Sequence, residues 1–203
     1  AGAGASQKKV SEFAKDNNVS GLEFMSCIPG SVGGGIRMNS GCFNKEFKDI
    51  LISIQLVDLN GIVKSIPANK INFNYRSIQL PQDLIFLSAT FKGKEENSSK
   101  INSIMYELNQ KKELSQPTKI KTSGSTFKNP IKKTDKKVWE LIRSSVSLQT
   151  RYGDAIISDK HANFFVNKKN AKSADMKLLI NFVKNEVKKK TGVTLELEIV
   201  VVE

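Results

Sequence analysis

The sequence predicts an α+β fold, in which helices and strands follow one another without a regular βαβ rhythm. Apolar residues alternate with polar ones over 50–56, a pattern typical of a half-buried strand. They recur at helical spacing over 101–108 and again over 173–190, which indicates two amphipathic helices. With 203 residues, of which 39% are hydrophobic, the chain is long enough to bury a sizeable core in one large domain or two small ones.

The first half of the chain is expected to contain one helix and then three strands. The helix follows Ser6 and stops at the pair Asn17–Asn18, because asparagine favours the turns that end helices. The first two strands are joined by Asn60–Gly61, a pair typical of tight hairpin turns. The expected strands are 50–56, 62–66 and 84–91.

The helix over 101–108 is expected to end near Pro117, a proline that marks a boundary between two subdomains. Two serines just before this helix are candidate N-terminal caps. We therefore expect a first domain over 1–114 and a second over 115–203.

The second domain is expected to hold two helices and a final strand. A short helix begins at about Asp135, and a longer one runs over 173–190, with Ser173 as the candidate cap and Gly192 as the stop. Four apolar residues then alternate with polar ones as a strand: Val193, Leu195, Leu197 and Ile199.

The composition narrows the possible chemistry. The formal net charge of +12 attracts polyanions, which include nucleic acids and phosphorylated small molecules, although a lysine-rich composition can also reflect genome bias. Cys27 and Cys42 form no CxxC pattern and the chain has a single histidine, so two reduced thiols are expected and a zinc site is not. No run of apolar residues approaches the roughly 18 that a membrane span requires.

The segment 28–41 is too rich in glycine to be an ordinary helix or strand. Its glycines permit positive φ and close approach of the backbone, so that successive N–H groups can converge on an anion, and Ser31 and Asn39 add polar side chains. It matches neither the P-loop nor the dinucleotide GxGxxG pattern. Apolar residues frame it, which favours a buried ligand-binding loop over a flexible surface loop. The segment indicates an anion or a cofactor without specifying which.

The segment 124–130, GSTFKNP, places small residues before a hydroxyl, an aromatic ring, a cation and an amide. Ser125 lacks the GxSxG frame of many hydrolases. A pair with His161, in the motif HANFFVN, is conceivable, but a serine hydrolase also needs an acid and an oxyanion hole, which the sequence does not mark. A lone histidine beside a strand is more often structural.

Arg76 and the pair Glu196 and Glu198 each allow both a functional and a structural interpretation when the sequence around them is considered alone. Arg76 lies just before a predicted strand, and its planar guanidinium fits a carboxylate or a phosphate, although a surface ion pair is the simpler interpretation. Glu196 and Glu198 share one face of the final strand, and such a face usually meets solvent.

Taken in order, a series of motifs resembles the successive motifs of the UDP-N-acetylenolpyruvoylglucosamine reductase family, with the spacings kept over nearly the whole chain. The most specific pair is IPGSVGGGIRMNSG at 28–41 and GSTFKNP at 124–130. The interval between Tyr75 and Gly124 is short, so the chain resembles the compact subclass. The family's N-terminal flavin-binding segment is expected to be missing before Ala1. The other motifs are GAGA at 2–5, GLEF at 21–24, YRS at 75–77, HANFFVN at 161–167 and GVTLELEI at 192–199.

The resemblance implies that 1–114 is the second part of a FAD-binding domain and that 115–203 is an α+β substrate-binding domain. It implies that NADPH reduces the flavin, and that hydride then passes from flavin N5 to C3 of the enolpyruvyl group of UDP-N-acetylenolpyruvoylglucosamine. The product, UDP-N-acetylmuramate, is a cytoplasmic precursor of bacterial peptidoglycan. The implied protein is a monomer that binds no metal, nucleic acid or membrane.

The resemblance also assigns roles to residues. Arg76 pairs with the substrate carboxylate, where negative charge develops after hydride transfer, and Glu198 assists there as a buried, protonated acid. Ser125 donates a proton to C2. Flavin contacts are expected from Pro29, Gly30, Ser31, Gly33, Gly34, Arg37 and Asn39, and substrate contacts from Tyr75, Lys128 and Asn129.

Two other interpretations stay open. A different flavin oxidoreductase that shares only the FAD part is disfavoured, because Ser125, Lys128 and Glu198 lie outside that part and still match. Alternatively, the chain is an inactive fragment that retains only sugar-nucleotide binding, because a flavin held from one side loses much of its burial.

Overall fold

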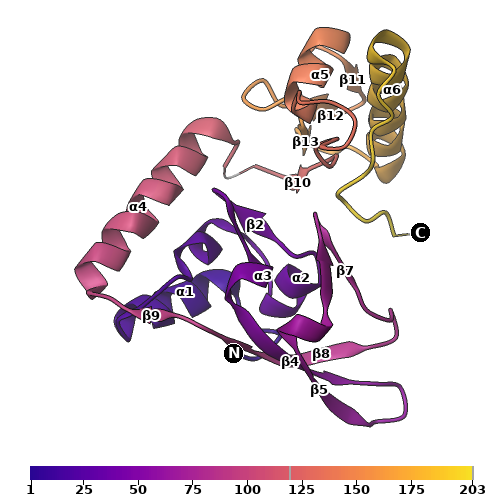
Figure 1. Ribbon diagram of the computed structural model, residues 1–203. Helices are drawn as coiled ribbons and strands as arrows, with labels where there is room; N and C mark the ends of the chain where they lie inside the picture. The colour runs from indigo at the N-terminus through magenta and orange to yellow at the C-terminus, as the bar shows by residue number, and fades with distance from the viewer. Residues whose placement is uncertain (119, 203) are drawn as a thin grey trace. The chain divides into compact units, whose positions relative to one another are not determined.

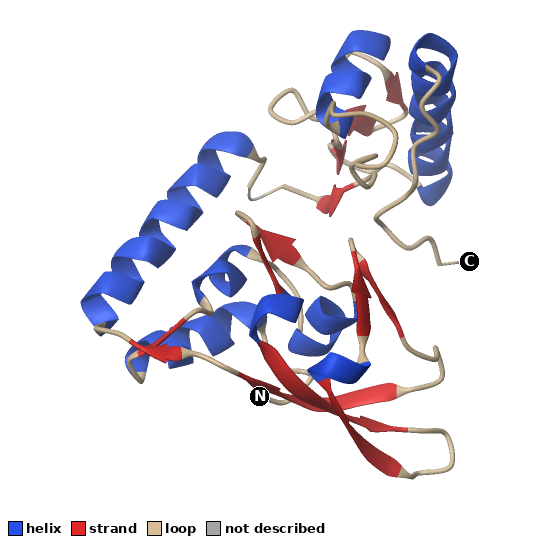
Figure 2. Ribbon diagram, in the orientation of Figure 1, coloured by secondary structure: helices blue, strands red, loops and turns tan. Residues whose placement is uncertain are grey.

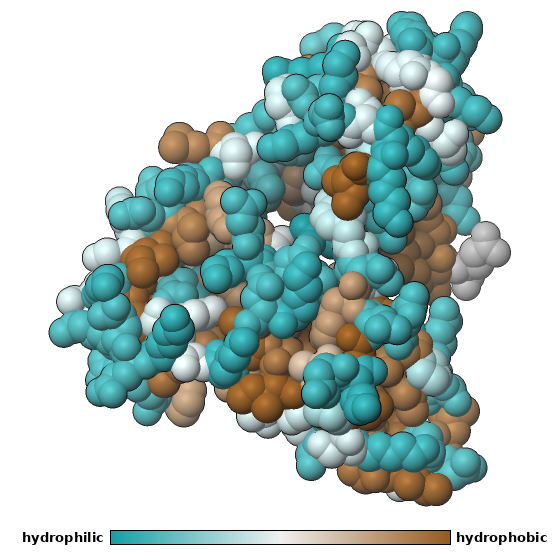
Figure 3. Space-filling model, in the orientation of Figure 1, coloured by the Kyte–Doolittle hydropathy of each residue, from teal (hydrophilic) through white to brown (hydrophobic). Residues whose placement is uncertain are grey.

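A computed structural model describes residues 1–118 and 120–202 of the protein. The chain forms two compact units, Ala1–Lys112 and Glu113–Glu203, and this division falls close to the expected boundary between 114 and 115. Helices and antiparallel strands are mixed in both units, which confirms the predicted α+β class (Figure 2). Hydrophilic side chains cover most of the visible surface, with brown apolar patches between them (Figure 3). None of the described helices is both long and apolar enough to span a membrane.

The first helix of the unit Ala1–Lys112 is the one that the sequence predicts after Ser6. α1 (Gln7–Asp16) starts directly after Ser6, and Asn18 beyond its end has a φ of 59°, the left-handed conformation that asparagine tolerates (Figure 1). The helix predicted over 101–108 extends further in both directions, as α4 (Ser98–Ser115). Short helical turns lie between these two helices: η1 (Glu23–Cys27), α2 (Val32–Arg37), α3 (Phe47–Ile50) and η2 (Ala68–Lys70).

The same unit contains a three-stranded antiparallel sheet with the order β5-β4-β8. At the predicted hairpin turn Gly61 has a φ of 80°, and the Asp58 carboxylate accepts backbone hydrogen bonds from Asn60 and Ile62, both at 3.0 Å. The three predicted strands are confirmed as β4 (Leu51–Val57), β5 (Val63–Pro67) and β8 (Ile85–Phe91). Short ribbons complete the unit: β1 (Val19–Ser20) with β9 (Lys94–Glu95), β2 (Gly41–Cys42) with β3 (Lys45–Glu46), and β6 (Asn72–Asn74) with β7 (Ser77–Gln79).

The core of this unit is built around the fully buried ring of Phe47. This ring meets Phe24 at a centroid distance of 6.0 Å and Phe91 at 5.7 Å, both edge-on. α2 packs so close to it that a Cβ atom on Gly35 would lie 2.5 Å from Phe47. Packing therefore requires glycine at this position, because any side chain would overlap the ring.

The unit Glu113–Glu203 contains a four-stranded antiparallel sheet with the order β10-β13-β12-β11. In its core Phe127 and Phe165 meet edge-on at 5.9 Å, and two helices, α5 (Val138–Ser145) and α6 (Ser173–Thr191), contribute further apolar side chains. The strands are short, and the periodicity of the sequence did not predict them. They are β10 (Thr122–Ser125), β11 (Arg151–Tyr152), β12 (Ala155–Ile157) and β13 (Phe164–Asn167).

Both helices of this unit were predicted. α6 starts at Ser173 and ends before Gly192, whose φ of 73° is the left-handed conformation of a C-terminal cap. α5 begins at Val138 rather than at about Asp135. The later start has a physical cause, because the Asn129 side chain accepts a hydrogen bond from the Val138 N–H at 3.1 Å and so satisfies one of the free donors of the first turn.

The predicted final strand is wrong as a strand, although its pattern of burial is right. Leu195 is buried, and Val193, Leu197 and Ile199 pack partly buried against the same core. Within the described part of the chain, the segment has one β-bridge, between Leu197 and Phe127. The alternation therefore places side chains on the core without the continuous ladder that defines a strand.

Candidate functional site

The glycine-rich segment contains a helix, which corrects the expectation that it would be neither helix nor strand. α2 begins after Ser31, whose hydroxyl oxygen accepts a hydrogen bond from the Gly34 N–H at 3.2 Å. The carbonyl oxygen of Ser31 accepts a second bond from the Gly35 N–H at 2.9 Å. A capping serine compensates for the low helix propensity of glycine, because it satisfies donors that the first turn would otherwise leave unpaired.

The expected set of free N–H groups in this segment is also corrected. The Val32 N–H donates to the Ala5 carbonyl at 2.9 Å, and the Gly33 N–H donates to the Ala3 carbonyl at 2.8 Å. With the two bonds to Ser31, every amide from 32 to 35 has an acceptor inside the protein. A Cβ atom on Gly33 would lie 3.1 Å from the side chain of Ala3, so this glycine serves close packing of two chain segments.

Part of the glycine-rich segment nevertheless remains accessible to a ligand. Pro29, Gly30 and Gly34 are exposed, Ser31 is half-buried and Gly33 is buried. Gly30 has a φ of 115°, a conformation that other residues rarely adopt. The backbone that a flavin can reach is therefore restricted to the turn before α2 and one exposed position on the helix.

Asn39 is fully buried, and its side chain holds the fold together. Its Nδ2 atom donates to Glu46 Oε2 at 3.0 Å and to the Asn74 carbonyl at 3.1 Å. Its Oδ1 atom accepts from the Lys48 N–H at 3.1 Å. With 0% exposure, Asn39 fixes the exit of the glycine-rich segment, and its side-chain amide is bonded within the protein. Its predicted contact with a flavin stays a prediction.

Arg76 occupies the turn of the β6–β7 hairpin with a φ of 56°. Its Nη2 donates to the Gly41 carbonyl at 2.9 Å, and its Nη1 lies 3.8 Å from Glu46 Oε1. The guanidinium also lies 4.9 Å from the ring centre of Tyr75. Glu46, which sequence reasoning missed, thus joins Arg76 to the exit of the glycine-rich segment. No local signal marks such a pair, because its members are far apart in sequence.

The other arginine of interest, Arg37, is half-buried at the end of α2. Its Nη1 donates to the carbonyl oxygens of Leu80 at 3.3 Å and Pro81 at 3.1 Å. The structure therefore gives this side chain two backbone partners, which hold the end of α2 against the segment that follows β7.

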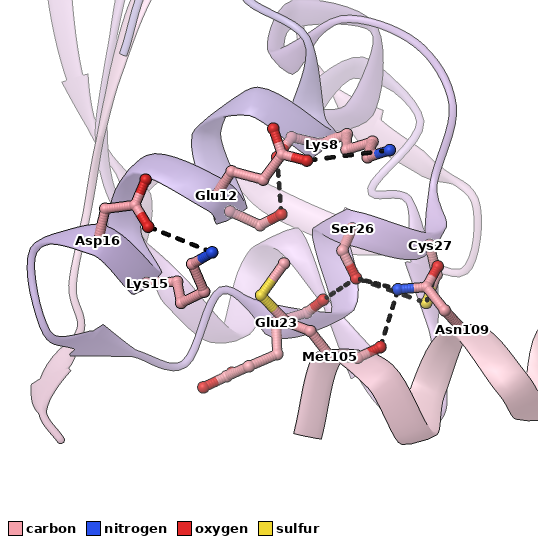
Figure 4. A network of polar contacts seen from close by, with 10 residues as sticks. Lys8, Glu12, Lys15, Asp16, Glu23, Ser26, Cys27, Met105 and Asn109 are labelled. Atoms are coloured by element: carbon pink, nitrogen blue, oxygen red, sulfur yellow. Dashed lines mark hydrogen bonds and ion pairs between the residues drawn. The ribbon is translucent and has the colours of Figure 1, made fainter. Parts of the chain in front are cut away.

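The two cysteines are free thiols and interact with each other. The hydrogen bond with Cys42 lowers the pKa of Cys27 to about 6, against the effect of burial, and Ser26 and Lys112 contribute in the same direction. The pKa of Cys42 is raised by the same hydrogen bond and by burial. Figure 4 shows Asn109 beside Ser26 and Cys27, where its Nδ2 donates to Ser26 Oγ at 3.2 Å.

In the second unit, the segment 124–130 brings two predicted residues together. Ser125 ends β10 opposite Phe164 of β13, and Gly124 before it has a φ of 87°. The Thr126 carbonyl then accepts a hydrogen bond from the Glu198 N–H at 2.9 Å, and the Lys128 N–H donates to the Glu196 carbonyl at 2.8 Å. Ser125 and Glu198 therefore lie on neighbouring segments of backbone.

The side chains around this pairing differ in what they contact. Glu198 is half-buried in this chain, and its expected burial during the reaction stays a prediction. Asn129 uses its Oδ1 to cap α5, so its expected contact with a substrate competes with a structural bond. Ser125 and Lys128 are half-buried, and neither their hydroxyl nor their ammonium group contacts a polar partner among the described residues. They are the groups of this segment that a ligand can engage.

His161 has the structural role that the simpler interpretation expected. Its ring meets Phe164 at 4.8 Å, and its Nδ1 accepts a hydrogen bond from the Asn163 N–H at 3.3 Å. Burial lowers its pKa, which favours the neutral ring that can accept this bond. The described residues show no hydrogen bond between His161 and Ser125, so a serine hydrolase pair is absent there.

The candidate catalytic residues are divided between the units, with Arg76 in Ala1–Lys112 and both Ser125 and Glu198 in Glu113–Glu203. The division agrees with two family profiles. Residues 1–66 match the FAD binding domain, and residues 116–202 match the C-terminal domain of UDP-N-acetylenolpyruvoylglucosamine reductase.

Two relatives that match nearly the whole chain are both UDP-N-acetylenolpyruvoylglucosamine reductases. The UDP-N-acetylenolpyruvoylglucosamine reductase of Pelagibacter ubique is 60% identical over 98% of this chain, and that of Rickettsia bellii is 41% identical over 94%. The chain spans 66% and 62% of these relatives' own lengths. The crystal structure of the reductase from Thermus caldophilus superimposes with a TM-score of 0.85 and 31% identity, over 97% of this chain and 69% of that one. The chain therefore belongs to the UDP-N-acetylenolpyruvoylglucosamine reductase family.

Proposed function

We propose that the protein reduces UDP-N-acetylenolpyruvoylglucosamine to UDP-N-acetylmuramate with FAD and NADPH, a step of peptidoglycan synthesis. In this proposal 1–114 is the second part of the FAD-binding domain, and 115–203 binds the sugar nucleotide. The observation that carries the proposal is the backbone hydrogen bond between Thr126 and Glu198, because it places the segment of a candidate proton donor, Ser125, beside that of a candidate acid, Glu198. The nucleotide substrates imply a cytoplasmic enzyme, and we propose a monomer.

The residues of the first unit fit a flavin along a limited surface. The exposed glycines Gly30 and Gly34 have no side chains that would hold a planar ring system away. A Cβ atom on Gly30 would come no closer than 3.9 Å to the protein, so the space around this position is open. When bound, FAD would accept hydride from NADPH and supply it to the substrate.

The protein side chains manage charge and protons during the reaction. Addition of hydride at C3 pushes negative charge onto the substrate carboxylate, which Arg76 stabilises with its fixed cation while Glu198 assists as an acid. Gly41 and Glu46 orient the plane of the guanidinium. Ser125 then gives its proton to C2. A serine is a weak acid, but the enediolate that it meets is a strong base, so correct placement is the main requirement.

Binding of the sugar nucleotide relies on a second set of residues. Lys128 offers a cation to the diphosphate, and Tyr75 contacts the substrate from the first unit. Asn129 contributes by accepting the hydrogen bond from the Val138 N–H, which fixes the course of the chain directly after Lys128.

The alternative is that this chain by itself binds sugar nucleotides without turnover, because it spans only 66% of the length of a 60%-identical relative. Three measurements on the purified chain separate the two possibilities: the visible spectrum of bound flavin, NADPH oxidation with substrate, and calorimetric titration with UDP-N-acetylglucosamine. A yellow, active chain would support the reductase proposal directly. Colourless chain that binds the sugar nucleotide would support the alternative for this length of polypeptide. Absence of turnover in a flavin-loaded, full-length protein would contradict the proposed function.

A further inference from the structure

The motif HANFFVN contains a buried amide that holds the segment beside Ser125. Asn163 is 4% exposed. Its Oδ1 accepts a hydrogen bond from the Phe127 N–H at 3.0 Å, and its Nδ2 donates to the Phe127 carbonyl at 2.8 Å. Its own backbone carbonyl accepts from the Thr126 N–H at 2.8 Å. One residue therefore binds three backbone groups in the two positions that follow Ser125.

These bonds continue a strand pairing that would otherwise stop. β10 and β13 pair at Ser125 and Phe164, after an irregularity in register between Thr122 and Ser125. Beyond this point the Asn163 side chain bonds both the N–H and the carbonyl of Phe127, as the backbone of a paired strand residue would. The ring of His161 supports the arrangement, because its Nδ1 accepts from the Asn163 N–H at 3.3 Å.

The segment after Ser125 is held from two sides. Asn163 binds the N–H of Thr126, while the carbonyl of Thr126 accepts from the Glu198 N–H at 2.9 Å. A shift of this residue would move Ser125 and the Glu198 backbone relative to each other. Proton transfer depends steeply on such distances, and a misplacement of about 1 Å can cost about 100-fold in rate.

We propose that Asn163 is the positioning residue of the site: it sets the place of Ser125 relative to Glu198 through the backbone of Thr126 and Phe127. This inference rests on the proposed function. Asn163 itself touches neither substrate nor cofactor in this proposal, because its amide is buried and bonded to Phe127.

The test compares two amides of the same strand region that clamp backbone in the same way. Asn167 accepts from the Ala171 N–H at 2.9 Å and donates to the Ala171 carbonyl at 3.3 Å, away from Ser125 in the chain. Asn163→Asp removes the donor to the Phe127 carbonyl and keeps the acceptor, whereas Asn167→Asp makes the same change at the matched control. Asn163→Ser is the second variant, to be used where the aspartate fails to fold.

Activity is measured in the full-length reductase that carries these residues. We expect Asn163→Asp to slow the substrate half-reaction by about 100-fold, with flavin reduction by NADPH and the KM for substrate changed less than about threefold. Asn167→Asp should leave both half-reactions unchanged. In the double variant with Ser125→Ala, the Asn163 change should add little further loss, because both act on the same proton transfer. Full additivity, or equal effects of the two asparagine variants, would overturn the proposal.

A measurement without turnover separates this inference from the proposed function. Asn163→Ser removes the side-chain oxygen that accepts from the Phe127 N–H, so amide hydrogen exchange at Phe127 should rise in this variant and stay unchanged in Asn167→Ser. Unchanged exchange at Phe127 would overturn the positioning role even if activity fell. Absence of turnover in the flavin-loaded full-length protein would contradict the proposed function, while faster exchange would still support Asn163 as the residue that positions this segment.

Discussion

The segments 28–41 and 124–130 carry similar sequence signals but use them differently. In the first, glycines allow close packing: Gly33 approaches Ala3, Gly35 lies against Phe47, and the amides of 32–35 are bonded inside the protein. In the second, the backbone is bonded to Asn163 and to 196–198, and the side chains of Ser125 and Lys128 are left to a ligand. Glycine-rich sequence therefore does not by itself mean free N–H groups.

The largest expected effect concerns the side chain of the second segment. Ser125→Ala in the full-length reductase should leave flavin reduction by NADPH nearly intact and slow the substrate half-reaction by about 10²–10⁴-fold, because the proton donor to C2 is lost. Rapid-mixing absorbance of the flavin follows the two half-reactions separately. An equal loss in both would mean that Ser125 supports the fold or the flavin, and the contrast between the segments would disappear.

A second prediction tests whether the first segment uses its glycines for packing. Gly35→Ala should lower the free energy of unfolding by about 1–3 kcal/mol, because the new methyl group overlaps the Phe47 ring. Gly34→Ala is the matched control on the same helix, since its nearest neighbour would be Ser31 Oγ at 3.4 Å. The control should stay within about 1 kcal/mol of the parent. Urea unfolding of this chain measures both, and equal losses would contradict the packing role of Gly35.

The β6–β7 hairpin places the side chain of Arg76 beside the first segment. The substitution Arg76→Lys tests whether the planar guanidinium contributes to the reaction beyond its positive charge. Lysine keeps the charge but loses the planar fork that contacts Gly41 and Glu46. We expect kcat to fall by about tenfold, equivalent to about 1.4 kcal/mol, with a smaller change in substrate affinity. Steady-state kinetics of the full-length enzyme measure kcat and KM for the parent and for Arg76→Lys. A change confined to KM would show that Arg76 only anchors the bound substrate.

The last prediction concerns the two thiols on either side of the first segment, where the effect appears only as a dependence on pH. The pKa of Cys27 is lowered from 9.0 to about 6, so its thiolate contributes stability that is present above pH 9.0 and lost as pH falls through about 6. The unfolding free energy of the parent should therefore rise more steeply between these pH values than that of Cys27→Ala. Cys42→Ala removes the principal hydrogen bond to the thiolate and should flatten the same dependence. Parallel pH profiles in all three proteins would contradict this assignment.

The helices and the main sheet of the first unit were predictable because their signals are local. α1, α4 and α6 follow the spacing of apolar residues, and the strands β4 and β5 follow alternation and the Asn60–Gly61 turn. Short elements were missed for the same reason. Strands of two to four residues, such as β10 to β13, are too brief to show a period, and neighbours in space decide whether they pair.

The candidate site was predictable as a set of motifs but not as a set of contacts. Ser125, Glu198 and Arg76 were predicted from motifs, and their roles in the reaction stay predictions. The partners that hold them were not, because Glu46 and Asn163 are far in sequence from the residues they orient. A side chain's partner depends on which segments the fold brings together, and no local pattern records that.

The sequence by itself determined the fold class and the family motifs, because these depend on local conformation and on side-chain type. Only the tertiary structure decided what became of the polar groups. It bonded the amides of Val32 and Gly33 to the carbonyl oxygens of Ala5 and Ala3, buried Asn39, and turned the Asn163 side chain toward Phe127. Most buried polar groups are hydrogen-bonded, and the packing of distant segments against each other decides which partners they find.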